Sequence, residues 1–84
     1  MISVEQCRAG RALLDWSAQQ LAIEAKVGVA TVRRFESGHA VADVSLEAMQ
    51  AALSRGGIVF VEPGKKAPPG GAGVRFALES SDAT

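Results

Sequence analysis

A four-residue pattern that starts helices occurs twice in the first quarter of the chain. Ser3 is followed three residues later by Gln6, and Ser17 is followed in the same way by Gln20. In such a capping box the serine side chain binds a free backbone N–H at the start of a helix, and the glutamine side chain reaches back. The repeat therefore predicts one helix from Ser3 to about Leu14 and a second from Ser17 to about Ala25.

Glycines mark the third helix at both ends. After a turn at 26–28, Gly28 is placed to cap a helix that covers roughly residues 29–37, and Gly38 is placed to end it. Val32 and Phe35 are three residues apart, which is the spacing of two side chains on one helical face. We expect these two to point inward, and the polar residues on the other faces to point outward. These polar residues are Thr31, Arg33 and Arg34.

A fourth helix and two strands complete the expected fold. Residues 39–44 are expected to form a loop, Ser45 to cap the fourth helix, and Gly56 to stop it. Residues 58–62 and 74–78 are rich in strand-forming residues and are separated by a Pro/Gly-rich loop, which predicts a β-hairpin. An isolated hairpin is marginal in water, so it must pack on the helices or pair with another chain.

The expected fold is therefore mainly α, with four short helices that contain a helix-turn-helix, followed by a C-terminal two-stranded β-hairpin. Residues 1–57 form the helical domain, residues 58–78 a hairpin extension for dimerisation, and residues 79–84 a disordered tail. The chain has 84 residues, enough for one small domain.

Composition narrows the functional classes. Nine basic and nine acidic residues give a net charge of zero, which argues against strong nonspecific binding to nucleic acid. No apolar run is long enough to span a membrane, and the first residues do not resemble a secretory signal, so we expect a cytoplasmic protein. The lone cysteine, Cys7, is expected in the core. Without a Cys/His cluster, a phosphate-binding loop or a nucleophile–base pair, we expect no metal, no cofactor and no enzymatic activity.

Residues 8–53 carry a further pattern in order and spacing. It consists of Arg11, Trp16-Ser17, Leu21-Ala22, Thr31-Val32, Glu36-Ser37-Gly38 and Ser45-Leu46-Glu47. In this respect the chain resembles the phage-repressor/Cro-like, or XRE-like, helix-turn-helix family. The resemblance covers more than half of the chain and implies a lambda-repressor-like fold that binds double-stranded DNA.

The resemblance also implies a role for individual residues. The groove-facing positions on the recognition helix are Gly28, Val29, Ala30, Thr31 and Arg34. The phosphate-facing positions are Ser17, Ala18, Gln19, Ser37 and His39. Arg11 and Glu36 match a structural ion pair. From its projection about 100° away from Arg34, we expect Arg33 to reach phosphate as well.

Four positions depart from the family pattern. Lys26 stands where the family usually has a glycine with positive φ, and Gly28 stands where serine or threonine is usual. Val29 and Ala30 replace polar residues that read bases in relatives. We therefore expect recognition to depend on few hydrogen bonds and more on methyl contacts and DNA shape.

Three functional hypotheses follow. The first is a homodimeric transcriptional regulator, repressor or activator, with half-sites about 34 Å apart. Its dimer contacts are expected at Ile58, Phe60, Val74 and Phe76. The second is an antitoxin that binds a toxin through its C-terminal part. The third is a protein-interaction module that no longer binds DNA. Possible protein partners are a toxin or RNA polymerase.

Overall fold

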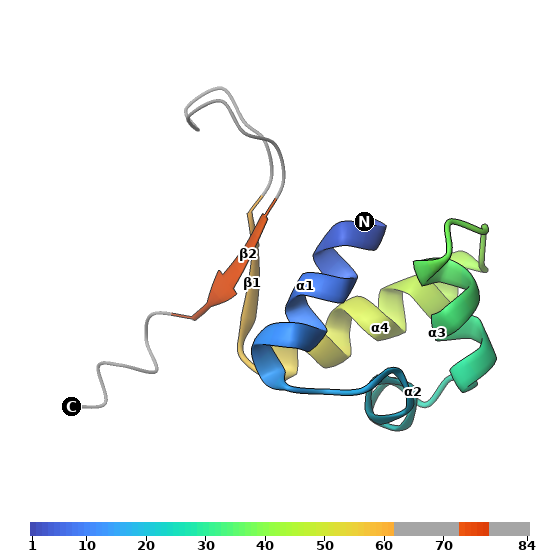
Figure 1. Cartoon of the computed structure of the whole chain (residues 1–84), viewed down its shortest axis with the longest axis horizontal. Helices are drawn as coiled ribbons and strands as arrows, with labels where there is room; N and C mark the ends of the chain where they lie inside the picture. Colours follow the sequence, from blue (N-terminus) through green and yellow to red (C-terminus); the bar gives the residue numbers. More distant parts are fainter. Residues whose placement is uncertain (62–72, 78–84) are drawn as a thin grey trace.

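In the part of the chain that the structure describes, the fold consists of four helices followed by a β-hairpin (Figure 1). A computed structural model describes residues 1–61 and 73–77. The elements are α1 (Val4–Leu14), α2 (Ala18–Ala25), α3 (Val29–Glu36), α4 (Asp43–Arg55), β1 (Ile58–Val61) and β2 (Gly73–Phe76). The predicted fold class is confirmed. The disordered tail expected at 79–84, and the strand ends expected at Glu62 and Leu78, lie outside the described residues.

The serine caps of the first two helices form as predicted. The Ser3 hydroxyl accepts a hydrogen bond from the Gln6 backbone N–H (3.0 Å), and the Gln6 side chain accepts one from the Ser3 N–H (2.9 Å), so this capping box is complete. The Ser17 hydroxyl likewise accepts from the Gln20 N–H (3.0 Å). The Gln20 side chain, however, donates to Glu24 at 2.9 Å instead of reaching back. The second capping box is therefore only half formed.

α3 is terminated by a glycine, as predicted. Gly38 has φ +93°, in the left-handed region that favours glycine. Its N–H donates to the Phe35 carbonyl at 2.9 Å, and the His39 N–H donates to the Arg34 carbonyl at 3.0 Å. This pair of bonds is a Schellman motif, which satisfies the last carbonyls of the helix.

The predicted start of the fourth helix is wrong. α4 begins at Asp43, so that Ser45 lies inside its first turn and the loop before it ends at Ala42. Ala42 provides no side-chain cap, and the Ser45 N–H donates to the Ala42 carbonyl at 3.0 Å. The Asp43 carboxylate is favourable in the first turn because it complements the positive end of the helix dipole. The Asp43 carboxylate thus stabilises the start of α4 in place of the hydroxyl cap expected at Ser45.

The core lies where all four helices meet. Its largest fully buried side chains come one or two from each helix: Cys7, Leu21, Val32, Met49 and Leu53. Phe35 joins them as predicted, whereas Leu46 is half-buried at the rim. Burying these apolar side chains, each contributing roughly 1.5–3 kcal/mol, is the main force that holds the short helices together.

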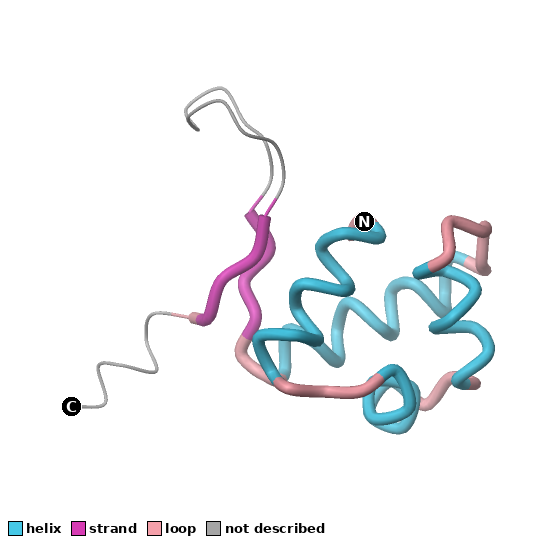
Figure 2. Tube along the Cα trace, viewed as in Figure 1, coloured by secondary structure: helices cyan, strands magenta, loops and turns pink. Residues whose placement is uncertain are grey.

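The hairpin is antiparallel and packs against α1 (Figure 2). Ile58 pairs with Phe76 and Phe60 pairs with Val74. The Ile58 side chain is only 3% exposed and belongs to the core of the monomer, where it lies close to Gly10 of α1. We therefore no longer place Ile58 among the residues that contact a second protomer.

One buried side chain joins the hairpin to α1. The Gln6 amide nitrogen donates to the carbonyl of Val61 (3.3 Å) and to that of Gly73 (3.1 Å), which are paired residues of β1 and β2. Gln6 is 3% exposed, and both ends of its amide have partners. The same residue thus completes the first helix cap and fixes the hairpin.

None of the helices in the described part of the chain has the length and apolar character needed to cross a bilayer. Residues 1–61 and 73–77 also contain no group of three His, Cys, Asp or Glu side chains placed to hold a metal ion.

Candidate nucleic-acid interface

The pair α2–α3 is joined by a tight turn in which Lys26 has φ +60°. The Val27 N–H donates to the Ala22 carbonyl at 3.0 Å and so closes α2 over this left-handed residue. Lys26 thus adopts the positive φ for which the family usually has a glycine, and this conformation is costly for a residue with a Cβ. The turn leads directly to Gly28, which caps α3 without a side chain of its own.

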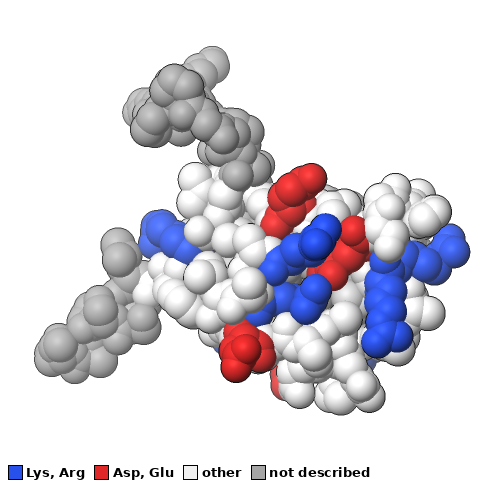
Figure 3. Space-filling model, in the orientation of Figure 1, with Lys and Arg blue, Asp and Glu red and all other residues white. Residues whose placement is uncertain are grey.

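One face of α3 is exposed to solvent. Val32 and Phe35 are buried, and the residues on the opposite side of the helix are exposed: Ala30, Arg33 and Arg34. With about 100° between successive residues, Ala30 lies at the middle of this exposed stripe and the two arginines lie on either side of it. On the face drawn in Figure 3, basic side chains gather over α1 and α3. The predicted outward direction of both arginines is confirmed.

The five positions expected to face the groove differ in exposure. Gly28, Ala30 and Arg34 are exposed, whereas Val29 and Thr31 are half-buried at the edges of the stripe. Of these five, Arg34 has the longest exposed side chain and can reach farthest into a groove.

The positions expected to meet phosphate are all accessible. Ser17, Gln19, Arg33, Ser37 and His39 are exposed, and Ala18 is half-buried. At the start of α2 the Ser17 hydroxyl accepts the hydrogen bond of the Gln20 N–H. In the described structure the N–H groups of Ala18 and Gln19 have no hydrogen-bond partner. Free N–H groups at the positive end of a helix favour an anion.

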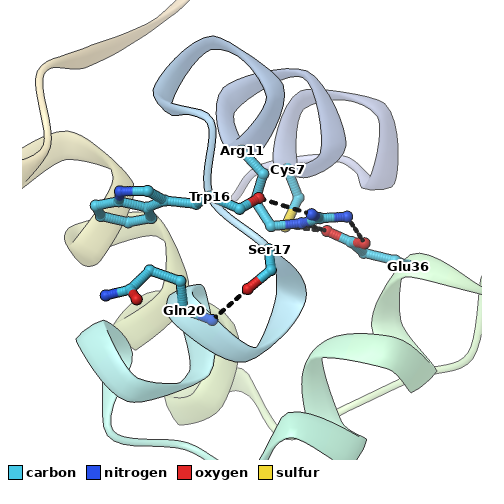
Figure 4. A network of polar contacts seen from close by, with 6 residues as sticks. All are labelled: Cys7, Arg11, Trp16, Ser17, Gln20 and Glu36. Atoms are coloured by element: carbon cyan, nitrogen blue, oxygen red, sulfur yellow. Dashed lines mark hydrogen bonds and ion pairs between the residues drawn. The ribbon is translucent and has the colours of Figure 1, made fainter.

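The ion pair expected between Arg11 and Glu36 is confirmed (Figure 4). Arg11 Nη2 lies 2.6 Å from Glu36 Oε1, and Arg11 Nε donates to Oε2 at 2.9 Å. The remaining nitrogen, Nη1, donates to the Trp16 carbonyl at 3.0 Å. The side chains of Arg11 and Glu36 are 21% and 11% exposed. One guanidinium thus ties α1 to the end of α3 and to the loop before α2.

A third member of this network was not expected from the sequence. The Cys7 thiol donates to Glu36 Oε2 at 3.1 Å, and Cys7 is fully buried. Burial, together with the hydrogen bond to the Glu36 carboxylate, raises the pKa of the thiol well above its usual value. Cys7 and Arg11 are four residues apart and so share one helical face, and this spacing is the signal that could have suggested the contact.

The charge state of Glu36 follows from these contacts. Burial alone would raise the pKa of its carboxyl group, but the hydrogen bonds from Arg11 and Cys7, helped by the positive charges of Arg11 and Arg8, hold it below its usual value. The hydrogen bond to Glu36 in turn raises the pKa of Arg11. Both partners are therefore ionised at neutral pH, and the network holds α3 in a fixed orientation against α1.

No protein-family model matches the chain, and a comparison with curated proteins finds no similar sequence. The function of the site is therefore inferred from its geometry.

Proposed function

We propose that the chain is a sequence-specific DNA-binding regulator of the phage-repressor/Cro-like type, with α3 lying in the major groove. The observation that carries the proposal is the exposed face of α3, on which Arg33 and Arg34 flank Ala30. The buried side chains of Val32 and Phe35, together with the Arg11–Glu36 ion pair, hold the other side of this helix against the rest of the protein. A short helix fixed in this way, with arginines directed outward, suits entry into a groove about 12 Å wide.

Base contacts come from few groups in this proposal. The Arg34 guanidinium can donate two hydrogen bonds to O6 and N7 of guanine, a contact worth about 1–3 kcal/mol of discrimination. Ala30, and the methyl groups of Val29 and Thr31 at the edges of the stripe, suit contact with the methyl group of thymine.

Phosphate contacts come from the segments on either side of α3. The free N–H groups of Ala18 and Gln19 at the start of α2 suit one phosphate of the backbone. The exposed Ser37 and His39, which follow α3, suit another. Such contacts orient the protein on the duplex without reading its sequence.

A homodimer is part of the proposal because one α3 makes few base contacts. Two copies related by a two-fold axis would double them and would read half-sites about 34 Å apart. The hairpin offers apolar surface for this purpose, since Phe76 is 48% exposed and Val61 is 37% exposed. Phe60 and Val74, which are half-buried against the core, would support the interface from within.

Selection of bound duplexes from a random library, followed by titration of the best duplex, tests the proposal. We expect enrichment of a two-fold symmetric site and loss of at least tenfold in affinity in Arg34→Ala. Arg55→Ala is the matched control, because Arg55 is exposed at the far end of α4 and donates only to the Glu24 carbonyl (3.0 Å). Equal affinity of the Arg34→Ala variant and the wild type would contradict the proposal.

A second candidate function is a protein-interaction module. Ile23 on α2 is 61% exposed and Val44 on α4 is 70% exposed, so apolar side chains are available outside the proposed DNA surface. An antitoxin would combine both activities, and a toxin gene beside its own gene would favour that alternative. Failure of the wild type to bind any duplex at low salt would favour the interaction module.

A further inference from the structure

A shallow depression of about 360 Å³ lies between α1 and the end of α3. It is lined by Arg8, Arg11, Arg33, Glu36 and Ser37. None of the functions considered so far uses Arg8, and the sequence pattern assigned no role to it. Three guanidinium groups and one carboxylate give this depression two net positive charges.

Two residues of the depression, Arg11 and Glu36, bind each other. Both oxygens of Glu36 accept hydrogen bonds from Arg11, and Oε2 also accepts one from Cys7. Each of the three guanidinium nitrogens of Arg11 has a partner, because Nη1 binds the Trp16 carbonyl. This pair is neutral as a unit, and three of the five N–H donors of Arg11 are used within the protein, so the net positive charge of the depression belongs to Arg8 and Arg33.

The other two arginines are different. Arg8 and Arg33 are exposed, and within the described part of the chain neither makes a hydrogen bond or an ion pair, although the charge of Arg8 acts on the Glu36 carboxylate. They stand on α1 and α3, the two elements that also carry the neutral pair. The exposed Ser37 adds a hydroxyl group that can donate to the same ligand.

We propose that this depression binds a phosphate group of the DNA backbone through Arg8, Arg33 and Ser37. The inference rests on the proposed function, since Arg33 belongs to the exposed stripe of α3 and Ser37 directly follows it. A duplex that lies against α3 therefore brings its backbone to the depression, and Arg8 extends the interface onto α1. Guanidinium groups suit phosphate because their planar donors match two phosphate oxygens.

The salt dependence of binding tests this proposal. Each phosphate that a protein neutralises contributes about 0.9 to the slope of log K against log salt concentration. We expect Arg8→Gln to reduce this slope by about 0.9 per protomer, and to weaken binding to the specific and to a scrambled duplex by the same factor. Arg33→Gln is expected to behave in the same way.

Arg55→Gln is the matched control because it removes the same charge at the last residue of α4, outside the depression. Its slope is expected to stay within error of the wild type. If Arg8→Gln and Arg55→Gln have the same slope, the phosphate site is wrong, although the proposed function stands as long as the wild type binds DNA. If the wild type binds no duplex, both fail.

Inorganic phosphate, added at constant ionic strength, separates a DNA site from a site for a free anion. We expect the side-chain Nε–H resonances of Arg8 and Arg33 to move with DNA and to stay in place with phosphate up to several millimolar. Saturable movement with phosphate alone would assign the depression to a free anion and would overturn the proposal.

Discussion

Removal of the Glu36 charge is the perturbation whose effect follows most directly from the structure. Glu36→Gln keeps the shape of the side chain but leaves the Arg11 guanidinium without its counter-charge. Loss of one partner from a fully buried ion pair costs about 3–5 kcal/mol, and a hydrogen bond to a charged group contributes about 1.5–3 kcal/mol. Because Arg11 is 21% exposed and Glu36 is 11% exposed, solvent screens part of the loss. We expect a decrease of about 2–3 kcal/mol in the free energy of unfolding at pH 7.

Such a loss is large for this chain. A domain of this size has a free energy of unfolding of roughly 4–12 kcal/mol and loses about 4–8 °C in Tm for each kcal/mol. We therefore expect Tm to fall by roughly 10–20 °C. Urea unfolding followed by circular dichroism at one fixed protein concentration measures the free energy. Glu24→Gln is the control, because Glu24 is exposed and its side chain accepts a bond only from Gln20. Its expected loss is below about 0.5 kcal/mol.

The pH dependence gives a second check on the same variant. The pKa of Glu36 in the folded protein lies below its ordinary value of 4.5. A carboxyl group of this kind stabilises the fold fully above the unfolded pKa, and its contribution disappears as the pH falls through the folded pKa. The difference between wild type and Glu36→Gln should therefore be constant from pH 8 to about pH 5.5 and shrink below pH 4.5. A difference below about 0.5 kcal/mol at pH 7, or one that does not change with pH, would refute the reasoning.

Three further predictions concern single positions. Lys26→Gly should stabilise the fold by about 0.5–1 kcal/mol in urea unfolding, because it relieves the left-handed conformation at φ +60°. A methyl group at Gly10 would sit 3.5 Å from the Leu53 side chain, so Gly10→Ala should raise Tm through helix propensity. Gly56→Ala should lower Tm, because its methyl would lie 2.8 Å from Leu14 Cδ1 and 3.2 Å from the rigid ring of Trp16, so that both side chains would have to shift. Cys7 should not react with a thiol reagent at pH 8 without denaturant, since it is fully buried and its pKa is raised.

Local signals in the sequence predicted the helices well because caps and glycine stops act within a few residues. Ser3, Ser17 and Gly38 lie where the patterns placed them. The start of α4 differs from the prediction because the carboxylate of Asp43 stabilises its first turn, in place of the hydroxyl cap expected at Ser45.

Contacts between distant residues were harder to predict. The Arg11–Glu36 pair was expected only through the family resemblance, and the Cys7 thiol on the same carboxylate was missed. The link from Gln6 to the paired strands joins residues more than fifty positions apart. No local pattern contains such a contact, because it depends on how the hairpin packs against α1. The burial of Ile58 inside the monomer has the same origin.

The central claim is that DNA lies against the exposed face of α3 and the start of α2. Amide resonances of uniformly ¹⁵N-labelled protein, recorded with and without the selected duplex, test this claim directly. We predict that the largest shifts map to Ala18, Gln19 and residues 28–39, and that β1 and β2 change little. Shifts confined to the hairpin or to the outer face of α4, or no shifts at all, would contradict the claim.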